Sequence, residues 1–496
     1  MMLDPDACYR AMSARDPRFD GRFFVGVSST GVYCRPVCRA RRPKPGNCSF
    51  FPSAAAAEAA GYRPCLLCRP ELAPGNAGVD ASGRLAQRAA GMIEDRISNG
   101  LDLDALAQGL AVTLRHLRRV FKAEFGVSPV VFAQTQRLLL AKRLLTDTHL
   151  SMAEVAFACG FGSIQRFNAL FQERYRLSPT TLRKQRRGSS SLGAFRFELT
   201  YRPPLDWDAL RSFLGRRAIG GVESVDGDTY YRTLRIEHHG EIHTGWISAS
   251  PSQTKPALIM MVSASLSKVL PRVLSRAKQA FDLSSDPDAV AAGLGDLAAR
   301  RPGLRLPGSW DGFELTARAI LGQQVTVQAA RTLATRLVRS FGEPLTSAPA
   351  GLSHLFPTAE RLAETSPADI QVLGVVGTRA RSIVGVAQAV ASGELSIAPG
   401  GDPTLLDASL RRLQGVGDWT AEYVVMRGLT WPDSFPASDR GVLRAMQEDD
   451  PKRAQKRAEV WRPWRSYAVM HLWRMLEEQH IEDRRSTEDR RPTEES

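Results

Sequence analysis

The chain has 496 residues, 43% of them hydrophobic, which is enough to form several packed domains. Its 66 Lys and Arg residues exceed its 52 Asp and Glu residues, and the formal net charge of +14 predicts a polyanionic partner, nucleic acid before an acidic membrane surface. No run of about eighteen apolar residues occurs, and the start of the chain lacks the pattern of a secretory signal. We therefore expect a soluble, cytoplasmic, nucleoid-associated protein and exclude a membrane-spanning one.

All seven cysteines lie before residue 160, and four of them have the spacing of a metal site. Three residues separate Cys34 from Cys38, two separate Cys65 from Cys68, and 26 lie between the pairs. Four thiolates at this spacing predict one tetrahedral Zn²⁺, with redox pairing as the alternative. Most such sites are structural, so the spacing alone assigns no chemistry. Two further cysteines are interpreted as ordinary thiols: Cys8 and Cys48.

The residues around these cysteines resemble the N-terminal zinc domain of the bacterial Ada methylation-response family. The matching segments are Ala14–Pro17 (ARDP), Thr30–Arg41 (TGVYCRPVCRAR) and Ala60–Cys65 (AGYRPC). The resemblance covers residues 1–78 and implies that Cys34 is both a zinc ligand and an irreversible acceptor of methyl from DNA methylphosphotriesters. Four thiolates on one Zn²⁺ carry a net charge of about −2, and methylation reduces it to about −1, which weakens the repulsion of DNA. A structural zinc site with an inert Cys34 stays open as the alternative.

Residues 79–187 contain an internal repeat with a spacing of fifty residues. Phe121–Phe132 (FKAEFGVSPVVF) recurs as Phe171–Leu182 (FQERYRLSPTTL). A short helix, a turn and a second helix precede each copy, and the second helices begin after the candidate N-caps Thr113 and Ser163. The sequence therefore predicts two helix-turn-helix units.

Each second helix has one apolar face, formed by Leu114, Leu117, Val120 and Phe121 in the first unit and by Ile164, Phe167, Leu170 and Phe171 in the second. The opposite faces carry residue types that contact bases or phosphates in a major groove: Arg115, Arg118, Arg119, Gln165, Arg166 and Asn168. The repeat resembles the AraC-type DNA-binding domain, which implies binding to promoter DNA and activation of RNA polymerase. A helical bundle with a solvated basic face is the alternative. Residues 188–193 are expected to be a flexible linker.

The remainder of the chain changes from a strand pattern to a helix pattern. Residues 194–300 alternate apolar and polar side chains between glycine-rich breaks, which predicts an antiparallel sheet with packed helices. Residues 301–480 are helical in pattern, and the charged tail 481–496 is expected to be disordered. The predicted class is multidomain α+β: a small zinc-bound α/β domain, an all-α double helix-turn-helix domain, a small antiparallel sheet with helices, and an all-α helix-hairpin-helix domain.

The stretch 413–439 (LQGVGDWTAEYVVMRGLTWPDSFPASD) predicts a helix-hairpin-helix followed by an acid. Gly415 and Gly417 allow backbone N–H groups and a helix N-terminus to face one point, which suits a DNA phosphate. About twenty residues later Asp439 begins another helix, where a carboxylate can face bound DNA. The alternatives are a plain αα-hairpin and a plain N-cap.

Residues 194–485 resemble the AlkA-type 3-methyladenine DNA glycosylases of the helix-hairpin-helix superfamily. The matching segments are Pro203–Trp207 (PPLDW), Ala299–Gly308 (ARRPGLRLPG), Arg318–Gln323 (RAILGQ), Gly415–Ala421 (GVGDWTA) and Trp464–Ala468 (WRSYA). The resemblance implies excision of alkylated bases of the 3-methyladenine and 7-methylguanine type, with Asp439 as the catalytic acid and no cofactor for this step. It also implies a base pocket of Trp419, Tyr423, Trp473 and Phe213. The implied DNA contacts are Gly415, Gly417, Gln323 and Gln324.

Several positions depart from that family. Trp419 stands where lyase members have a Schiff-base lysine, and the last two thirds of the chain contain no cysteine, so we expect base excision without strand cleavage or an iron–sulfur cluster. Gln324 stands where AlkA has an apolar wedge, and Ser438 and Arg440 replace an acid and an aromatic residue beside the catalytic acid. These departures keep open a transcription regulator whose glycosylase-like half binds DNA without catalysis. The second alkyl-acceptor module of full Ada proteins is not expected, and we expect a monomer.

Overall fold

The computed structural model describes residues 4–75, 81–98, 101–184 and 193–488, and its first module is built on a four-stranded sheet. The strand order is β3-β1-β2-β4; β1 is antiparallel to both β2 and β3, and β2 is parallel to β4. Tyr33 is in register with Pro64, so Cys34 and Cys65 follow side by side. The elements of this module are α1 (Pro5–Ala14), β1 (Phe24–Val27), β2 (Val32–Cys34), β3 (Cys48–Phe51), α2 (Ala54–Ala59) and β4 (Arg63–Pro64).

Seven helices form the second module and contain the two predicted helix-turn-helix units. They are α3 (Ala81–Asp95), α4 (Leu103–Gly109), α5 (Leu114–Phe125), α6 (Pro129–Asp147), α7 (Met152–Ala158), α8 (Ile164–Tyr175) and α9 (Pro179–Lys184). The predicted N-caps are confirmed, because Thr113 Oγ1 accepts the His116 N–H at 3.3 Å and Ser163 Oγ accepts the Arg166 N–H at 3.2 Å. The apolar faces are also confirmed, with four side chains fully enclosed: Leu117, Phe121, Phe167 and Phe171. Apart from Gly193, the predicted linker 188–193 lies outside the described residues.

The predicted antiparallel sheet is present, with five strands in the order β5-β9-β8-β7-β6. Its polarity alternates as in a sheet with one covered face: Phe195, Phe197 and Leu199 of β5 are buried, whereas Arg196 is exposed and Glu198 is partly exposed. The elements are β5 (Ala194–Thr200), α10 (Trp207–Arg216), β6 (Glu223–Asp226), β7 (Thr229–His238), β8 (Glu241–Pro251), β9 (Ala257–Ser263), α11 (Leu270–Ala280), α12 (Pro287–Leu294) and α13 (Asp296–Ala299).

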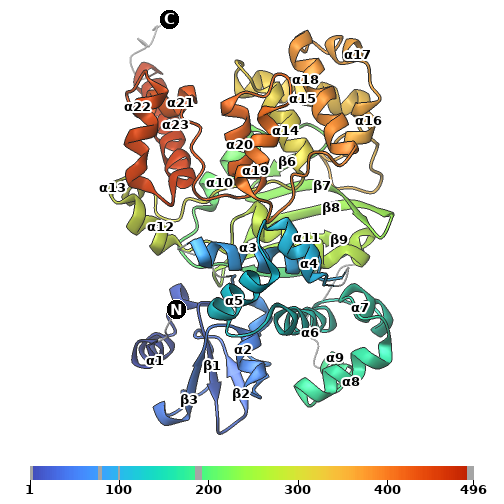
Figure 1. Ribbon diagram of the computed structural model, residues 1–496, viewed down its shortest axis with the longest axis vertical. Coiled ribbons are helices and arrows are strands. Elements are labelled where there is room, and N and C mark those ends of the chain that lie inside the picture. Colours follow the sequence, from blue (N-terminus) through green and yellow to red (C-terminus); the bar gives the residue numbers. More distant parts are fainter. Residues whose placement is uncertain (1–3, 76–80, 99–100, 185–192, 489–496) are drawn as a thin grey trace, which may run out of the picture.

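The C-terminal helices divide into two groups with different cores. They are α14 (Gly312–Leu321), α15 (Val327–Phe341), α16 (Ala359–Ala363), α17 (Pro367–Gln371), α18 (Gly377–Ala391), α19 (Pro403–Arg411), α20 (Asp418–Gly428), α21 (Arg440–Ala445), α22 (Pro451–Arg457) and α23 (Arg465–Glu488). Helices α14 to α20 share one hydrophobic core, whereas α21 to α23 belong to the core of the five-stranded sheet. Figure 1 shows the two groups standing side by side above that sheet.

The last helix is longer than the sequence predicts. The tail 481–496 was expected to be disordered, but α23 continues to Glu488; residues 489–496 lie outside the described residues. Extending an existing helix costs much less free energy than nucleating one, so a charged tail can continue a packed helix. None of the described helices is long and apolar enough to cross a membrane.

Direct contacts join the N-terminal modules (4–184) to the C-terminal half (193–488). Arg143 Nη2 of α6 donates to the Glu198 carbonyl at 2.6 Å, and Arg88 Nε of α3 donates to the Gly400 carbonyl at 3.1 Å. Buried Arg202 bonds the carbonyl of Gly75. Helix α3 lies against α11, and in Figure 1 the N-terminal modules cover one side of the five-stranded sheet. The N-terminal modules therefore pack on one side of the sheet, and α3 also contacts the loop between α18 and α19.

Candidate active site and metal centre

The hairpin between α19 and α20 contains the two predicted glycines, and they have different surroundings. Gly415 has φ +79°, and a Cβ there would lie 1.9 Å from Ser382 Oγ, so only glycine fits. Gly417 is exposed, N-caps α20 and has nothing within 4 Å of its Cβ position. Gln323 Nε2 donates to the Gly415 carbonyl and to Thr420 Oγ1, both at 3.0 Å. Gln323 thus holds the hairpin, and the residues that begin α20, Gly417 and Asp418, are exposed.

Asp439 lies at the start of α21 and accepts three hydrogen bonds. Its Oδ1 accepts the Val442 N–H at 2.8 Å, so the N-cap interpretation is correct. The two indole groups also donate to it, Trp419 Nε1 to Oδ2 at 2.7 Å and Trp473 Nε1 to Oδ1 at 2.9 Å. The N-cap role does not exclude the predicted site role, because Asp439 also lines a cavity.

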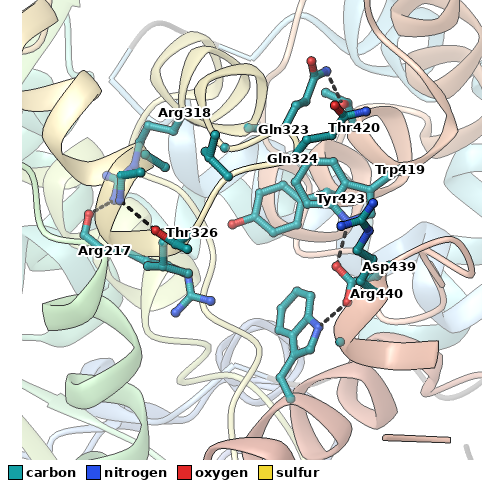
Figure 2. Close-up of a pocket in the computed structure, with 18 of the residues that line it drawn as sticks. Arg217, Arg318, Gln323, Gln324, Thr326, Trp419, Thr420, Tyr423, Asp439 and Arg440 are labelled. Atoms are coloured by element: carbon teal, nitrogen blue, oxygen red, sulfur yellow. Dashed lines mark hydrogen bonds between the residues drawn. The ribbon is translucent and has the colours of Figure 1, made fainter. Parts of the chain in front are cut away.

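The cavity has a volume of about 1270 Å³ and lies between the two groups of C-terminal helices. Trp419 and Tyr423 form one wall, stacked with ring centroids 5.2 Å apart and planes 16° apart. Trp473 of α23 lies opposite, 6.3 Å from Tyr423. Asp439 is at the edge of this aromatic space, as Figure 2 shows. The structure thus brings together three of the four predicted pocket residues with the predicted acid.

Phe213, the fourth predicted pocket residue, requires a correction. It is 4% exposed and does not line the cavity. Its ring lies behind Trp473, at a centroid distance of 6.3 Å, and the Arg217 guanidinium covers its face at 3.8 Å. The prediction failed because the sequence gives no sign that an arginine at the end of α10 occupies this face.

Arg217 and Arg427 are among the cavity-lining residues that were not predicted as site residues. Arg427 Nη1 donates to the Tyr423 hydroxyl at 2.7 Å, and Arg217 is the C-cap of α10. Burial by itself raises the pKa of Tyr423, but the nearby charges of Arg427 and Arg217 bring it below its ordinary value. Burial also lowers the pKa of Arg217 to about 10. Arg427 was detectable as the i+4 neighbour of Tyr423, whereas the place of Arg217 depends on tertiary packing.

The residues that depart from the AlkA pattern lie at the mouth of the cavity. Gln324 is exposed and has φ +54°, a left-handed conformation that is unfavourable for residues other than glycine. Backbone conformations of this kind occur often at functional sites. Val325 beside it is 36% exposed and lines the same opening, so an apolar side chain missed by the sequence analysis accompanies the glutamine. Ser438 and Arg440 are exposed at the rim.

Gly441 is a further residue that the sequence analysis missed. A Cβ at this position would lie 3.0 Å from Asp439 Oδ1 and 3.2 Å from Trp473 Cδ1. Both contacts are tight for a carbon atom. Gly441 therefore leaves room for the hydrogen bond between Trp473 and Asp439.

The four predicted ligand cysteines meet at one point in the first module. The sulfur atoms of Cys34, Cys38, Cys65 and Cys68 all lie within 4.8 Å of one another. Zn–S bonds of about 2.3 Å place the sulfurs of a tetrahedral site roughly 3.8 Å apart, so the cluster fits such an ion. The Arg35 N–H donates to Cys68 Sγ at 3.4 Å, which is the type of second contact that orients a thiolate ligand.

The six predicted groove-contacting residues are all exposed on the second helices of the two units: Arg115, Arg118 and Arg119 on α5, and Gln165, Arg166 and Asn168 on α8. Both helices turn an apolar face to the module core and this polar face to solvent.

Four family descriptions match successive parts of the chain. "Metal binding domain of Ada" matches residues 7–71, "Helix-turn-helix domain" matches 106–185, "AlkA N-terminal domain" matches 196–311, and "HhH-GPD superfamily base excision DNA repair protein" matches 317–465. The order of these matches follows the order of the modules in the structure.

Similar proteins cover the whole chain or its C-terminal half. The "Probable bifunctional transcriptional activator/DNA repair enzyme AlkA" of Mycobacterium tuberculosis (strain ATCC 25618 / H37Rv) is 37% identical over 491 residues, covering 96% of this chain and 97% of the relative. "DNA-3-methyladenine glycosylase 2" of Escherichia coli (strain K12) is 37% identical over 277 residues, covering 56% and 96%. Among solved structures, the 3-methyladenine DNA glycosylase of Archaeoglobus fulgidus matches with a TM-score of 0.48 and 21% identity, covering 56% of this chain and 97% of that chain.

The near-complete coverage at 37% identity, the order of the four matches and the two sites lead to one assignment. The chain belongs to the family of bifunctional transcriptional activator/DNA repair proteins that join Ada-type zinc-binding and AraC-type helix-turn-helix domains to an AlkA-type HhH-GPD glycosylase domain.

Proposed function

We propose that the protein repairs and senses DNA alkylation by two separate reactions. The C-terminal half hydrolyses the N-glycosidic bond of alkylated bases of the 3-methyladenine and 7-methylguanine type, and Cys34 takes methyl groups from DNA methylphosphotriesters. Methylation of Cys34 then strengthens promoter binding, and the bound protein activates RNA polymerase. The observation that carries the repair function is Asp439, held by two indole N–H groups at the edge of an aromatic cavity beside a helix-hairpin-helix.

In the proposed excision, a flipped nucleotide enters the cavity and its base lies against the Trp419–Tyr423 stack. A cationic base gains roughly 0.5–2 kcal/mol from each such ring. The bond between C1′ and the base nitrogen breaks, and its electron pair leaves with the base. The Asp439 carboxylate stabilises the positive charge that develops on the sugar. A water oxygen then bonds to C1′ and releases its proton to solvent.

In the proposed sensor reaction, Cys34 Sγ attacks the methyl carbon of a methylphosphotriester. The S–C bond forms as the C–O bond breaks, and the phosphodiester anion leaves with the electron pair. A Zn²⁺ held by Cys34, Cys38, Cys65 and Cys68 supplies the charge that keeps the sulfur a thiolate at neutral pH. The product is a thioether, so each molecule reacts once.

The test of the repair function is release of 3-methyladenine from methylated DNA by the wild-type protein and by Asp439→Asn. We expect release by the wild type and a loss of at least 100-fold in the variant, because the neutral amide does not stabilise the sugar cation. Absence of release by the wild type contradicts the repair function and favours the alternative, a regulator whose C-terminal half only binds DNA.

The test of the sensor function is mass spectrometry of the zinc-loaded protein after incubation with methylated DNA. We expect about one added methyl group, on Cys34, as one thiolate is used per molecule. An unmodified Cys34 contradicts the sensor function and leaves a structural zinc site.

A further inference from the structure

Arg217 lines the cavity but has no role in the proposed reaction. Its Nη1 donates to the Phe213 carbonyl at 3.3 Å, and its guanidinium covers the Phe213 ring at 3.8 Å. The residue lines the cavity, so its other N–H groups are available to an occupant. Figure 2 shows Arg217 across the cavity from Asp439, with Tyr423 between them.

Arg217 forms no ion pair with the described residues, whereas its neighbour Arg318 does. Arg318 Nη1 contacts carboxylates of Glu223 and Glu314, each at 2.8 Å. In the described part of the chain, no ion pair within 4.0 Å neutralises Arg217. Its packing on Phe213 fixes it in place, since a guanidinium over an aromatic face is held by cation–π attraction.

Tyr423 adds a second donor to the same side of the cavity. Its hydroxyl oxygen accepts the Arg427 N–H at 2.7 Å, and this arginine is held in turn by the carbonyls of Pro307 and Gly308 at 2.9 and 3.1 Å. The O–H of Tyr423 is then directed away from Arg427. Arg217 and Tyr423 therefore offer donors where a stacked base presents its edge.

We propose that Arg217 determines base specificity by donating a hydrogen bond to a carbonyl oxygen on the edge of the flipped base and disfavouring an amino group at that place. The inference rests on the proposed excision and deepens it. In DNA, 7-methylguanine and 3-methyladenine nucleotides carry the same positive charge, so a guanidinium repels both to a similar extent. They differ at C6, where guanine has a carbonyl acceptor and adenine an amino donor. A site built to donate a hydrogen bond rejects a base that does not accept it.

The test uses DNA treated with a methylating agent, so that one substrate contains both bases. The full-length protein is incubated with it, and released 7-methylguanine and 3-methyladenine are measured together over time. We expect Arg217→Met, which keeps a long apolar contact with Phe213, to lower the release of 7-methylguanine at least five-fold relative to 3-methyladenine. Arg217→Lys, which keeps the charge and a donor, should lie between the variant and the wild type.

The matched control is Arg211→Met, five residues before the last residue of the same helix; the Arg211 guanidinium bonds the Gly227 carbonyl and Asp208, away from the cavity. It should keep the wild-type ratio. If Arg217→Met lowers both releases in parallel, or 3-methyladenine more, Arg217 is only structural and the inference is wrong. If the wild type releases neither base, the proposed excision fails and this inference fails with it, whereas an unchanged ratio in an active variant overturns this inference alone.

Discussion

Asp439 is the residue on which the candidate active site depends most. It is half-buried, and within the described residues its carboxylate is contacted by three N–H donors and forms no ion pair; the donors are the backbone of Val442 and the indoles of Trp419 and Trp473. Hydrogen bonds to charged groups are stronger than neutral ones, each contributing about 1.5–3 kcal/mol. A carboxylate without an ion-pair partner keeps its charge available for a developing sugar cation. In the proposed excision the two tryptophans therefore contact the acid as well as the base.

Trp419→Phe separates these two roles, because phenylalanine keeps a ring beside Tyr423 and removes the indole N–H. We expect single-turnover excision of 3-methyladenine to fall about 10- to 100-fold, the equivalent of one charged hydrogen bond. In the Asp439→Asn background the same change should have little further effect, since the carboxylate is already absent. Equal losses in both backgrounds would falsify the coupling between Trp419 and Asp439.

At the scale of elements, the helix-hairpin-helix places two glycines under different constraints. Gly415 has a left-handed backbone and its Cβ position overlaps Ser382, so its glycine serves the fold. Gly417 has an extended backbone with open space around it, so nothing within the protein requires glycine there. The open space beside the N-terminus of α20 is where a phosphate would approach.

The two positions predict opposite results for alanine substitution. Gly415→Ala should lower the free energy of unfolding by about 1–3 kcal/mol through backbone strain and the contact with Ser382. Gly417→Ala should leave stability within about 0.5 kcal/mol and weaken DNA binding, because its methyl group faces the expected phosphate. Urea unfolding and DNA-binding titrations at fixed salt measure the pair. Wild-type DNA affinity for a stable Gly417→Ala would place the phosphate elsewhere.

At the scale of the whole molecule, a buried carboxylate joins the zinc module to the helix-turn-helix module. Glu58 of α2 accepts hydrogen bonds from Tyr33, which precedes Cys34, at 3.0 Å, from Thr135 of α6 at 3.0 Å, and from Tyr175 at the end of α8 at 3.3 Å. Burial is the main cause that raises the pKa of Glu58 to about 7, and the hydrogen bonds only partly oppose it. The strand that carries Cys34 is therefore linked through one side chain to α6 and to α8 of the second unit.

This raised pKa predicts how stability depends on pH. The ordinary pKa is 4.5, so between about pH 4.5 and pH 7 the native protein binds the Glu58 proton more tightly than the unfolded chain. Its contribution is fully present at lower pH and is lost as the pH rises through 7, a change of roughly 3 kcal/mol. Burial also raises the pKa of Asp282 to about 6 and of Glu422 to about 7. These two groups therefore also lower the free energy of unfolding as the pH rises.

Glu58→Gln isolates the contribution of Glu58 to the pH dependence of the free energy of unfolding, because glutamine keeps a carbonyl acceptor for Tyr33 and Tyr175 and does not titrate. Between pH 5 and pH 8 the free energy of unfolding should fall less in the zinc-loaded variant than in the wild type, by up to roughly 3 kcal/mol. Urea unfolding followed by circular dichroism at both pH values measures the difference, and the losses at Asp282 and Glu422 cancel because both proteins contain them. The same pH dependence in both proteins contradicts a titrating Glu58.

Much of this organisation is local in the chain and was predictable for that reason. The cysteine spacing, the fifty-residue repeat, the N-caps Thr113 and Ser163, and the glycine hairpin each depend on residues close in sequence. Trp419 and Tyr423 share one helix face at a spacing of four, so their stacking also follows from the helical repeat. These local patterns, together with the resemblance of successive segments to known families, predicted the fold class and the positions of the two candidate sites.

The contacts that define each site come from distant segments, and only the tertiary structure decided them. Trp419 and Trp473 line the same cavity although they come from different cores: α23 packs into the core of the five-stranded sheet, whereas α20 belongs to the other helical core. That packing buried Phe213 under Arg217 and turned both indoles toward Asp439. The sequence by itself determined which chemistries the chain contains, since reactive groups and turns are local. The tertiary structure decided what surrounds them, because burial and donor geometry depend on elements that no sequence spacing relates.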